Sequence, residues 1–191
     1  MSRLVRIGSE YFLHSVRINA AWCISFDTIV FALVYAEIAM VGTRPTIVLV
    51  HGAFADGSSW NKVIPLLQAE GLNAVAVQNP LTSLEDDVAA ANRIINAQTG
   101  PVVLVGHSWG GAVTTQASGH DNVKSLVYVA AFAPTLGAHS AADTTAFPAP
   151  PGFAHFIADA DGFLTLPADA IARDFAQDVS AEDANLIHAT Q

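Results

Sequence analysis

From residue 45 onward, short apolar runs alternate with segments in which apolar residues recur every three or four positions. Four runs are rich in β-branched residues and have the length of buried strands: residues 46–50, 73–77, 102–105 and 123–129. Runs that are apolar on both faces are typical of a parallel sheet covered by helices. The segments between them predict helices over residues 60–70, 83–97 and 110–118. Strand and helix in this regular order indicate an α/β fold with a doubly wound, mostly parallel sheet.

The helix expected over residues 83–97 has the clearest boundary signals. Ser83 is a good N-terminal cap, and the carboxylates at 85–87 suit the positive end of the helix dipole. Thr99-Gly100-Pro101 ends the helix. The residues expected to face the sheet are Val88, Ala91, Ile94 and Ile95.

After Ala133-Pro134 the regular alternation stops, and residues 134–166 mix prolines with small and aromatic residues. A helix is predicted over residues 167–178, with Pro167 in its first turn. Ser180-Ala181-Glu182-Asp183 resembles a capping box that opens a last helix. We interpret residues 44–133 as the core of one domain and residues 134–191 as a lid over the C-terminal edge of its sheet.

Residues 1–43 form an apolar N-terminal extension that does not fit this pattern. The apolar stretch from Ile18 to Gly42 is interrupted by Asp27 and Glu37, whereas a membrane-spanning helix needs about 20 apolar residues with few charges. A signal peptide needs a small-residue cleavage site, and Ala36-Glu37-Ile38-Ala39 is a poor match. The membrane and export readings remain open, but a membrane partner is not expected and we predict a cytoplasmic protein.

Two other interpretations of the extension are an additional helix and a stretch that is not part of the natural protein. Met40 directly precedes the first predicted strand, so a domain starting there could fold unaided. Peptides from before Met40, found by N-terminal mass spectrometry on native material, would contradict the second interpretation.

Composition narrows the function classes. The chain is 52% hydrophobic and 13% charged, so at 191 residues it can bury the core of a single domain. Its net charge of −9 argues against nucleic acid and anionic membrane surfaces as partners. The single cysteine excludes an internal disulfide framework, and the seven histidines lack metal-ligand spacing. No metal or organic cofactor is expected.

The candidate chemistry lies in Gly106-His107-Ser108-Trp109-Gly110, which directly follows an apolar run. In a GxSxG pattern the serine occupies a sharp strand-to-helix turn that presents its hydroxyl above the sheet. Side chains two positions before and after the serine would collide, which explains Gly106 and Gly110. Ser108 is therefore the candidate nucleophile.

A second piece is His51-Gly52-Ala53-Phe54, at the end of the first of these strands. A serine nucleophile needs backbone N–H donors for the oxyanion of its tetrahedral intermediate. One comes from the residue after the serine and the other from the loop after an earlier strand. We predict Trp109 and Ala53 as these donors, with Phe54 as the alternative to Ala53. His51 and Gly52 are expected to shape the loop.

Together, VLVHGAFADGSSW and VVLVGHSWGG resemble the α/β-hydrolase superfamily, in particular small esterases similar to plant methyl esterases and hydroxynitrile lyases. The resemblance implies that the strands at 46–50 and 102–105 are neighbours in the middle of the sheet. It also implies attack of Ser108 on a carboxylic ester through an acyl-enzyme, without metal or organic cofactor. The expected partner is a small apolar ester.

The chain departs from that family after Ser108, where the acid and the base of the triad should follow later strands. The histidines found there are His120, His139, His155 and His188, and none follows such a strand. The acids are too dense to single one out: Asp159, Asp161, Asp169, Asp174, Asp178 and Asp183. His107 is expected to point away from Ser108. The acid and the base are therefore predicted to lie beyond Gln191, in a longer esterase; the alternative is a serine site that lacks its activating residues.

Two consequences follow if the chain lacks its last strands. Its ester hydrolysis should be weak, because a serine site without its base retains only a rate about 10³–10⁴ above water. The strand at 123–129 would be an exposed apolar edge through which copies associate. A monodisperse monomer by light scattering would contradict that association.

The alternatives to an esterase are a catalytically silent ligand-binding protein and lyase or perhydrolase chemistry on the same scaffold. A dinucleotide site is disfavoured, because no GxGxxG follows the first strand.

Overall fold

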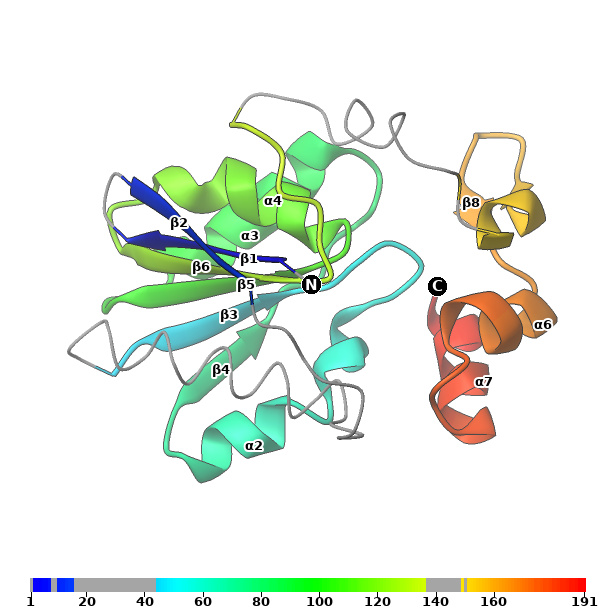
Figure 1. Ribbon diagram of the computed structural model, residues 1–191, viewed down its shortest axis with the longest axis horizontal. Coiled ribbons are helices and arrows are strands. Elements are labelled where there is room, and N and C mark those ends of the chain that lie inside the picture. Colours follow the sequence, from blue (N-terminus) through cyan, green and yellow to red (C-terminus); the bar gives the residue numbers. More distant parts are fainter. Residues whose placement is uncertain (1, 8–9, 16–43, 137–148, 150) are drawn as a thin grey trace.

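The computed structural model describes residues 2–7, 10–15, 44–136, 149 and 151–191. At its centre is a sheet of four parallel strands, shown in Figure 1, in the order β4 (Asn73–Ala76), β3 (Thr46–Val50), β5 (Val102–His107) and β6 (Val123–Val129). All four strands lie where the apolar runs predict them, although β4 ends one residue earlier and β5 two residues later. The predicted α/β fold with a parallel sheet is confirmed, as is the pairing of β3 with β5.

Helices cover both faces of the sheet (Figure 1). α3 (Leu84–Asn96) and α4 (Gly110–Gln116) lie on one face, and η1 (Gly57–Trp60) and α2 (Ile64–Ala69) lie on the other. Alternate side chains of β3 enter the two resulting cores, and all are fully buried from Ile47 to Val50. Burying one such side chain stabilises the fold by about 1.5–3 kcal/mol. The sheet is therefore a rigid base for the loops at its strand ends.

Most predicted helices form, with different bounds. α3 begins after Ser83, whose side chain accepts a hydrogen bond from the Asp86 N–H as predicted. The helix expected over residues 60–70 is split into the single turn η1 and the helix α2. Asp56 caps η1, and Pro65 stands in the first turn of α2, where its missing N–H costs nothing. α4 ends at Gln116 and tightens into η2 (Ala117–Gly119).

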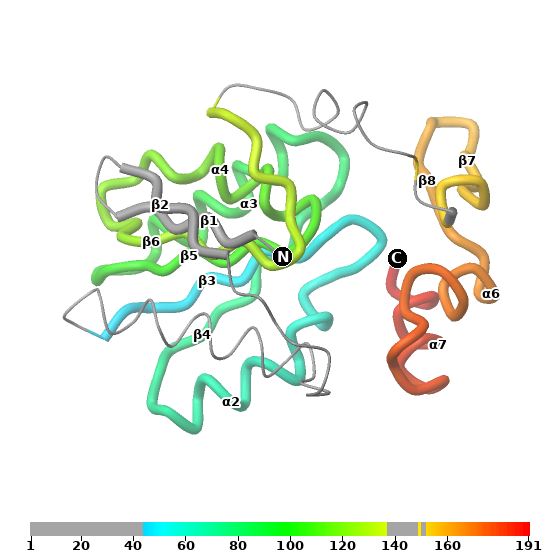
Figure 2. The backbone as a smooth tube through the Cα atoms, in the orientation of Figure 1, coloured from blue at the N-terminus to red at the C-terminus, as the bar shows by residue number. Residues whose placement is uncertain are grey.

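The C-terminal segment, defined as residues 149 and 151–191, lies beside the loop that follows β3 (Figure 2). Its elements are η3 (Pro151–His155), β7 (Ile157–Ala158), β8 (Leu164–Thr165), α6 (Ala168–Ala170), η4 (Ile171–Phe175) and α7 (Ala181–Thr190). The short antiparallel hairpin β7–β8 was not predicted. The helix expected over residues 167–178 is shorter, because α6 widens into one π-helical turn at η4. α7 is capped by Ser180 as predicted.

The C-terminal segment has a small apolar cluster of its own, formed by Leu166, Ala170, Ile171, Ala176 and Ala184. It contacts the core through Phe54, whose ring centroid lies 4.9 Å from that of Phe156. It also contacts the core through Lys62, whose Nζ lies 2.6 Å from Asp183 Oδ2. These attachments are few compared with the two clusters that hold the sheet.

Near the N-terminus, β1 (Ser2–Ile7) and β2 (Glu10–Ser15) form an antiparallel hairpin, and β1 lies beside β6 (Figure 1). No strand was predicted there. The apolar stretch 18–42, for which a helix was one interpretation, lies outside the described residues, as does Met40. Within the described ranges, no helix is long and apolar enough to cross a membrane. β6 is the last strand of the four-stranded sheet, but its apolar side chains from Leu126 to Val129 are buried and β1 lies beside it, so the expected exposed apolar edge is wrong. Association of copies along β6 stays a prediction.

Candidate active site

Ser108 occupies a sharp turn between β5 and α4. Its φ angle is 51°, in the left-handed region that non-glycine residues rarely adopt. The turn is held by its backbone, because Ser108 N–H donates to Val129 O over 3.3 Å and Ser108 O accepts from Gly111 and Phe132 N–H. The side chain is partly exposed, and its Oγ has no hydrogen-bond partner among the described residues. A strained residue of this kind, held by its surroundings, is typical of functional sites.

Close backbone contacts explain the glycines around Ser108. A β-carbon on Gly106 would lie 2.5 Å from both Gly110 O and Thr114 Oγ1. A β-carbon on Gly110 would lie 2.5 Å from Val50 O. Atoms cannot approach so closely, so any side chain at either position would force the turn open. The structure thus agrees with the steric reason that the sequence suggests for both glycines.

The loop after β3 lies directly against Ser108. A β-carbon on Gly52 would lie 3.0 Å from Ser108 Cβ, so glycine allows the two chain segments to approach. Ala53 and Phe54 follow, and Phe54 has a φ angle of 57°. The backbone N–H groups of Ala53 and Trp109 donate to no other residue within the described part of the chain. The structure therefore brings this loop and the Ser108 turn together, with both N–H groups free to bind a ligand.

His51 is fully buried and uses both ring nitrogens. Its Nε2 accepts a hydrogen bond from Asn79 N–H over 2.9 Å, so the proton resides on Nδ1, which donates to Gly52 O over 2.9 Å. Asn79 Nδ2 also donates to His51 O. Burial lowers the pKa of His51, which favours this neutral ring. His51 therefore joins the loops after β3 and β4 and has no nitrogen free to act as a base.

His107 packs edge-on against Trp60, with ring centroids 6.4 Å apart and an interplanar angle of 87°. Burial, together with the smaller effect of the nearby His51, lowers its pKa to about 4. At neutral pH the ring is uncharged, and the residue is half-buried beside Trp60. Its packing on Trp60 favours a structural role.

The histidines after Ser108 have partners away from the turn. His120 Nε2 is hydrogen-bonded to Asn92 Oδ1 ahead of the start of β6, at the opposite end of the strands. His155 lies 3.8 Å from Asp174, and His188 Nδ1 is bonded to Gln191, both within the C-terminal segment. His139 lies outside the described residues. None of the three described histidines is bonded to Ser108.

The acids considered from the sequence have local roles in the structure. Asp159 accepts from two backbone N–H groups in the β7–β8 turn, and Asp183 Oδ2 accepts from the Ser180 hydroxyl at the start of α7. Asp169 and Asp174 pair with Arg173. Asp161 and Asp178 are exposed. Among the residues placed by the structure, no group of three or more His, Cys, Asp or Glu could hold a metal ion.

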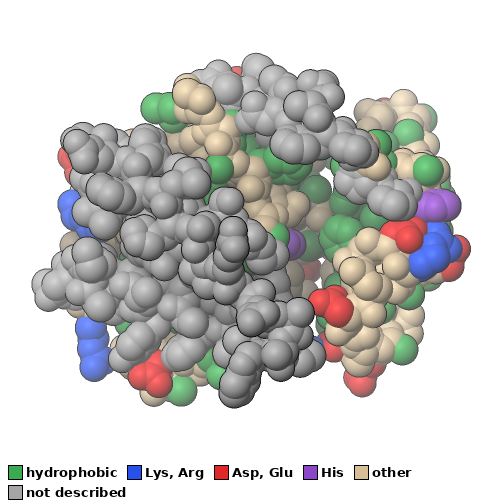
Figure 3. Space-filling view, viewed as in Figure 1, with side chains coloured by type: hydrophobic (Ala, Val, Ile, Leu, Met, Phe, Trp, Pro, Cys, Tyr) green, Lys and Arg blue, Asp and Glu red, His purple; other side chains and the backbone are tan. Residues whose placement is uncertain are grey.

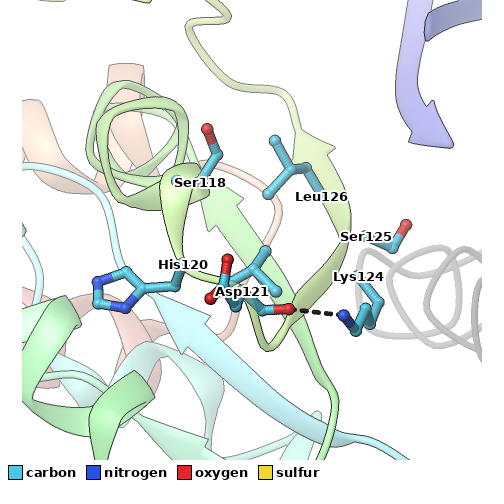
Figure 4. A pocket seen from close by; sticks show the side chains of 8 residues that line it. Ser118, His120, Asp121, Lys124, Ser125 and Leu126 are labelled. Atoms are coloured by element: carbon cyan, nitrogen blue, oxygen red, sulfur yellow. Dashed lines mark hydrogen bonds between the residues drawn. The ribbon is translucent and has the colours of Figure 1, made fainter. Parts of the chain in front are cut away.

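A surface cavity of about 350 Å³ lies near the start of β6, at the opposite end of the strands from the Ser108 turn (Figure 4). Ser118, His120 and Asp121 line it together with Lys124, Ser125 and Leu126, so it borders the start of β6. Ser108 instead follows the end of β5, the neighbouring parallel strand. The cavity is therefore separate from the candidate active site.

Sequence analysis missed the role of one acid, Asp87. It was grouped with Glu85 and Asp86 as a carboxylate favoured by the helix dipole, but its side chain is completely buried. Asp87 Oδ2 accepts a hydrogen bond from Trp109 Nε1 over 2.8 Å, and Oδ1 accepts from Leu81 N–H over 2.8 Å. The signal was available, because Asp87 precedes Ala91 by four residues and Ile95 by eight. These spacings place it on the inward face of α3.

Comparison with known proteins finds a relative in sequence and solved structures with a similar fold. The chain is 35% identical to a probable hydrolase of Phoma sp. over 111 residues, which cover 50% of this chain and 46% of the relative. Its fold is similar to that of a pyrethroid hydrolase from Sphingobium faniae, with a TM-score of 0.61 and 23% identity over 73% of this chain and 64% of that chain. Tomato methylketone synthase I gives a TM-score of 0.64 and 19% identity, covering 78% and 66% of the two chains.

The matched part spans about half the length of the curated relative and about two thirds of the similar structures. The model of a family described as the alpha/beta hydrolase family matches residues 47–190, which include both the loop after β3 and the Ser108 turn. This chain is a member of the alpha/beta hydrolase family.

Proposed function

We propose that the protein is a carboxylic ester hydrolase in which Ser108 is the nucleophile. The observation that carries the proposal is the placement of Ser108. It sits in a left-handed turn above the sheet, with Gly52 against its Cβ and two unbonded N–H groups in the adjoining loops. This is the arrangement that acyl transfer requires, with a nucleophile beside preorganised donors.

In the proposed reaction, Ser108 Oγ forms a bond to the ester carbonyl carbon while its proton passes to a base. The carbonyl oxygen becomes an oxyanion and accepts hydrogen bonds from Ala53 N–H and Trp109 N–H. The alkoxide leaves as an alcohol, and the acyl-enzyme is then hydrolysed by water. Small apolar esters fit the site best, because the rings of Phe54, Phe156 and Phe175 pack together next to this loop.

The base is the part of the reaction that the described residues do not supply. His51 has both nitrogens engaged, and His120, His155 and His188 have other partners. We therefore expect the 191-residue chain to hydrolyse esters slowly. The same observation favours a second candidate, a ligand-binding protein of this fold that does not turn over its ligand.

The experiment that separates the two candidates is labelling of the folded full chain with a fluorophosphonate, followed by mass spectrometry. We expect the label on Ser108 and its loss in Ser108→Ala. Ser118→Ala is the matched control, since Ser118 lies just after α4, at the far end from Ser108, and should leave labelling intact. Equal labelling of Ser108→Ala, or no labelling of the folded wild-type chain, would remove the esterase proposal and favour ligand binding.

A further inference from the structure

Asp87 is a buried carboxylate in the first turn of α3. Its side chain has no exposed surface, whereas Glu85 and Asp86 beside it are exposed. Taking a carboxylate out of water is costly unless hydrogen bonds replace its hydration. An apolar residue on this inward face of α3 would avoid that cost. The contacts of Asp87 therefore need an explanation beyond the stability of the helix.

Both oxygens of Asp87 are directed at segments outside α3. Oδ1 accepts from Leu81 N–H and Oδ2 accepts from Trp109 Nε1, each over 2.8 Å. Leu81 has a φ angle of 57°, so its bond to Asp87 supports a backbone conformation that costs energy. Trp109 immediately follows Ser108. One carboxylate thus connects the loop after β4 to the residue that follows the candidate nucleophile.

The same loop after β4 is also bonded to the loop after β3. Asn79, two residues before Leu81, donates one hydrogen bond to His51 Nε2 and another to His51 O. His51 in turn donates to Gly52 O, next to Ala53. Hydrogen bonds therefore connect residues 79–81 to the Trp109 indole through Asp87 and to the Gly52 carbonyl, which precedes the Ala53 N–H, through His51.

We infer that Asp87 is a positioning residue, which holds the indole of Trp109 and through it the backbone N–H of Trp109 beside Ser108. This inference rests on the proposed function, in which that N–H binds the oxyanion. An oxyanion donor binds the substrate oxygen most strongly when negative charge develops on that oxygen. Displacing the donor by a fraction of an ångström therefore costs more in the transition state than in the bound substrate. Loss of Asp87 should therefore slow the reaction of Ser108 in protein that remains folded.

The first test follows Trp109 directly by NMR of the full chain. Trp109→Phe keeps an aromatic side chain and the backbone N–H but removes the indole N–H donor. The resonance that disappears in this variant is therefore the indole N–H of Trp109. In Asp87→Asn only one oxygen remains for two donors, and we expect the indole and backbone N–H resonances of Trp109 both to move. Glu85→Gln removes an exposed charge from the same helix turn and should leave them in place. Trp109 resonances that are the same in Asp87→Asn as in Glu85→Gln would overturn the inference.

The second test measures the rate of fluorophosphonate labelling of Ser108 per folded molecule, with urea unfolding as a check on stability. We expect Asp87→Asn and Trp109→Phe each to slow labelling about tenfold or more. The double variant should be no slower than the slower single variant, because both changes remove one interaction. Independent losses that multiply in the double variant would show that Asp87 does not act through Trp109, which contradicts the inference.

Two further outcomes keep the proposals separate. If Asp87→Asn does not fold, Trp109→Phe alone decides, since unchanged labelling of this variant contradicts any role for the indole contact. If the folded wild-type chain is not labelled at Ser108, the proposed function fails. The resonances of Trp109 then still show whether Asp87 holds that residue in place.

Discussion

The loops at the strand ends and the C-terminal segment hold their polar groups in different ways. In the loops, polar groups are buried and bonded across the fold, as His51 is to Asn79 and Asp87 is to Trp109. In the C-terminal segment, Arg173 pairs at the surface with Asp169 and Asp174, and charged side chains gather on this part in Figure 3. The segment also leaves large apolar side chains exposed, among them Phe153, Ile157, Phe163, Leu164 and Leu186.

This difference indicates where the geometry of the protein is fixed. A buried donor or acceptor that loses its partner keeps the full cost of its desolvation, whereas a surface group exchanges its partner for water. The strand-end loops should therefore tolerate little change, and the C-terminal segment should tolerate much. The following substitutions test that contrast.

The largest effect is expected for Gly106→Ala. Its β-carbon would meet Gly110 O and Thr114 Oγ1 at 2.5 Å, and neither the backbone nor the buried Thr114 can move freely. We expect a loss of about 3 kcal/mol or more in the free energy of unfolding, measured by urea denaturation. Gly152→Ala in the C-terminal segment is the matched control, because its nearest neighbour would lie at an ordinary 3.4 Å. Equal effects of the two substitutions would contradict the contrast.

A loss of stability nearly as large is expected on acidification. Burial lowers the pKa of His107 to about 4, while a histidine in the unfolded chain titrates near 6.5. Between these values the unfolded state binds a proton that the folded state does not. Stability is therefore complete above pH 6.5 and falls by up to about 3 kcal/mol as the pH drops to 4.

Urea unfolding at a series of pH values measures this slope. His107→Gln should flatten it, because the variant has no group that titrates at this position. His188→Gln, which changes an exposed histidine of the C-terminal segment, should leave the slope unchanged. A slope that is as steep in His107→Gln as in the wild-type chain would contradict the assignment to His107.

Asn79→Ala should have an intermediate effect. It removes the hydrogen bond from Asn79 Nδ2 to His51 O and leaves that carbonyl without this donor. It also disturbs the Asn79 backbone N–H that donates to the fully buried His51 ring. We expect a loss of about 2 kcal/mol in unfolding free energy. Labelling of Ser108 should also slow, because His51 holds the loop that lies against it. If the unfolding free energy and the labelling rate both match those of the wild-type chain, Asn79 does not support the loop after β3.

The smallest effect is expected for Lys62→Met, which breaks the ion pair with Asp183 between the core and the C-terminal segment. The pair is exposed, so water replaces it at little cost, and 1 M salt should remove what remains of its contribution. The unfolding midpoint should change less than in Asn79→Ala and no more than in Lys124→Met, an exposed control. A salt-independent loss as large as that of Asn79→Ala would show that this pair fixes the segment.

The sheet could be predicted from the sequence because β-branched runs such as 46–50 and 123–129 are buried on both faces and carry a strong local signal. The turn at Ser108 could be predicted because only glycines fit at positions 106 and 110. Local signals were weaker for residues 151–175, where strands of two residues and a π-helical turn depend on tertiary packing.

The contacts that join the loops could not be predicted from local pattern. Asn79 lies 28 residues from His51, and Trp109 and Asp87 are 22 residues apart, so both pairings depend on the order of strands in the sheet. Asp87 was interpreted by its neighbours in the helix turn, although its spacing to Ala91 and Ile95 already placed it inward. No strand was predicted for the hairpin β1–β2.

The two hydrogen bonds of the His51 ring have a consequence for how selectivity can change in this protein. Since the loops after β3 and β4 are connected through that ring, neither can be enlarged or shifted alone. The other wall near the site consists of Phe156 and Phe175, which come from the more loosely attached C-terminal segment. Under the proposed function, new substrate preferences should therefore arise from substitutions in residues 151–191, while the loops after β3 and β4 remain as they are.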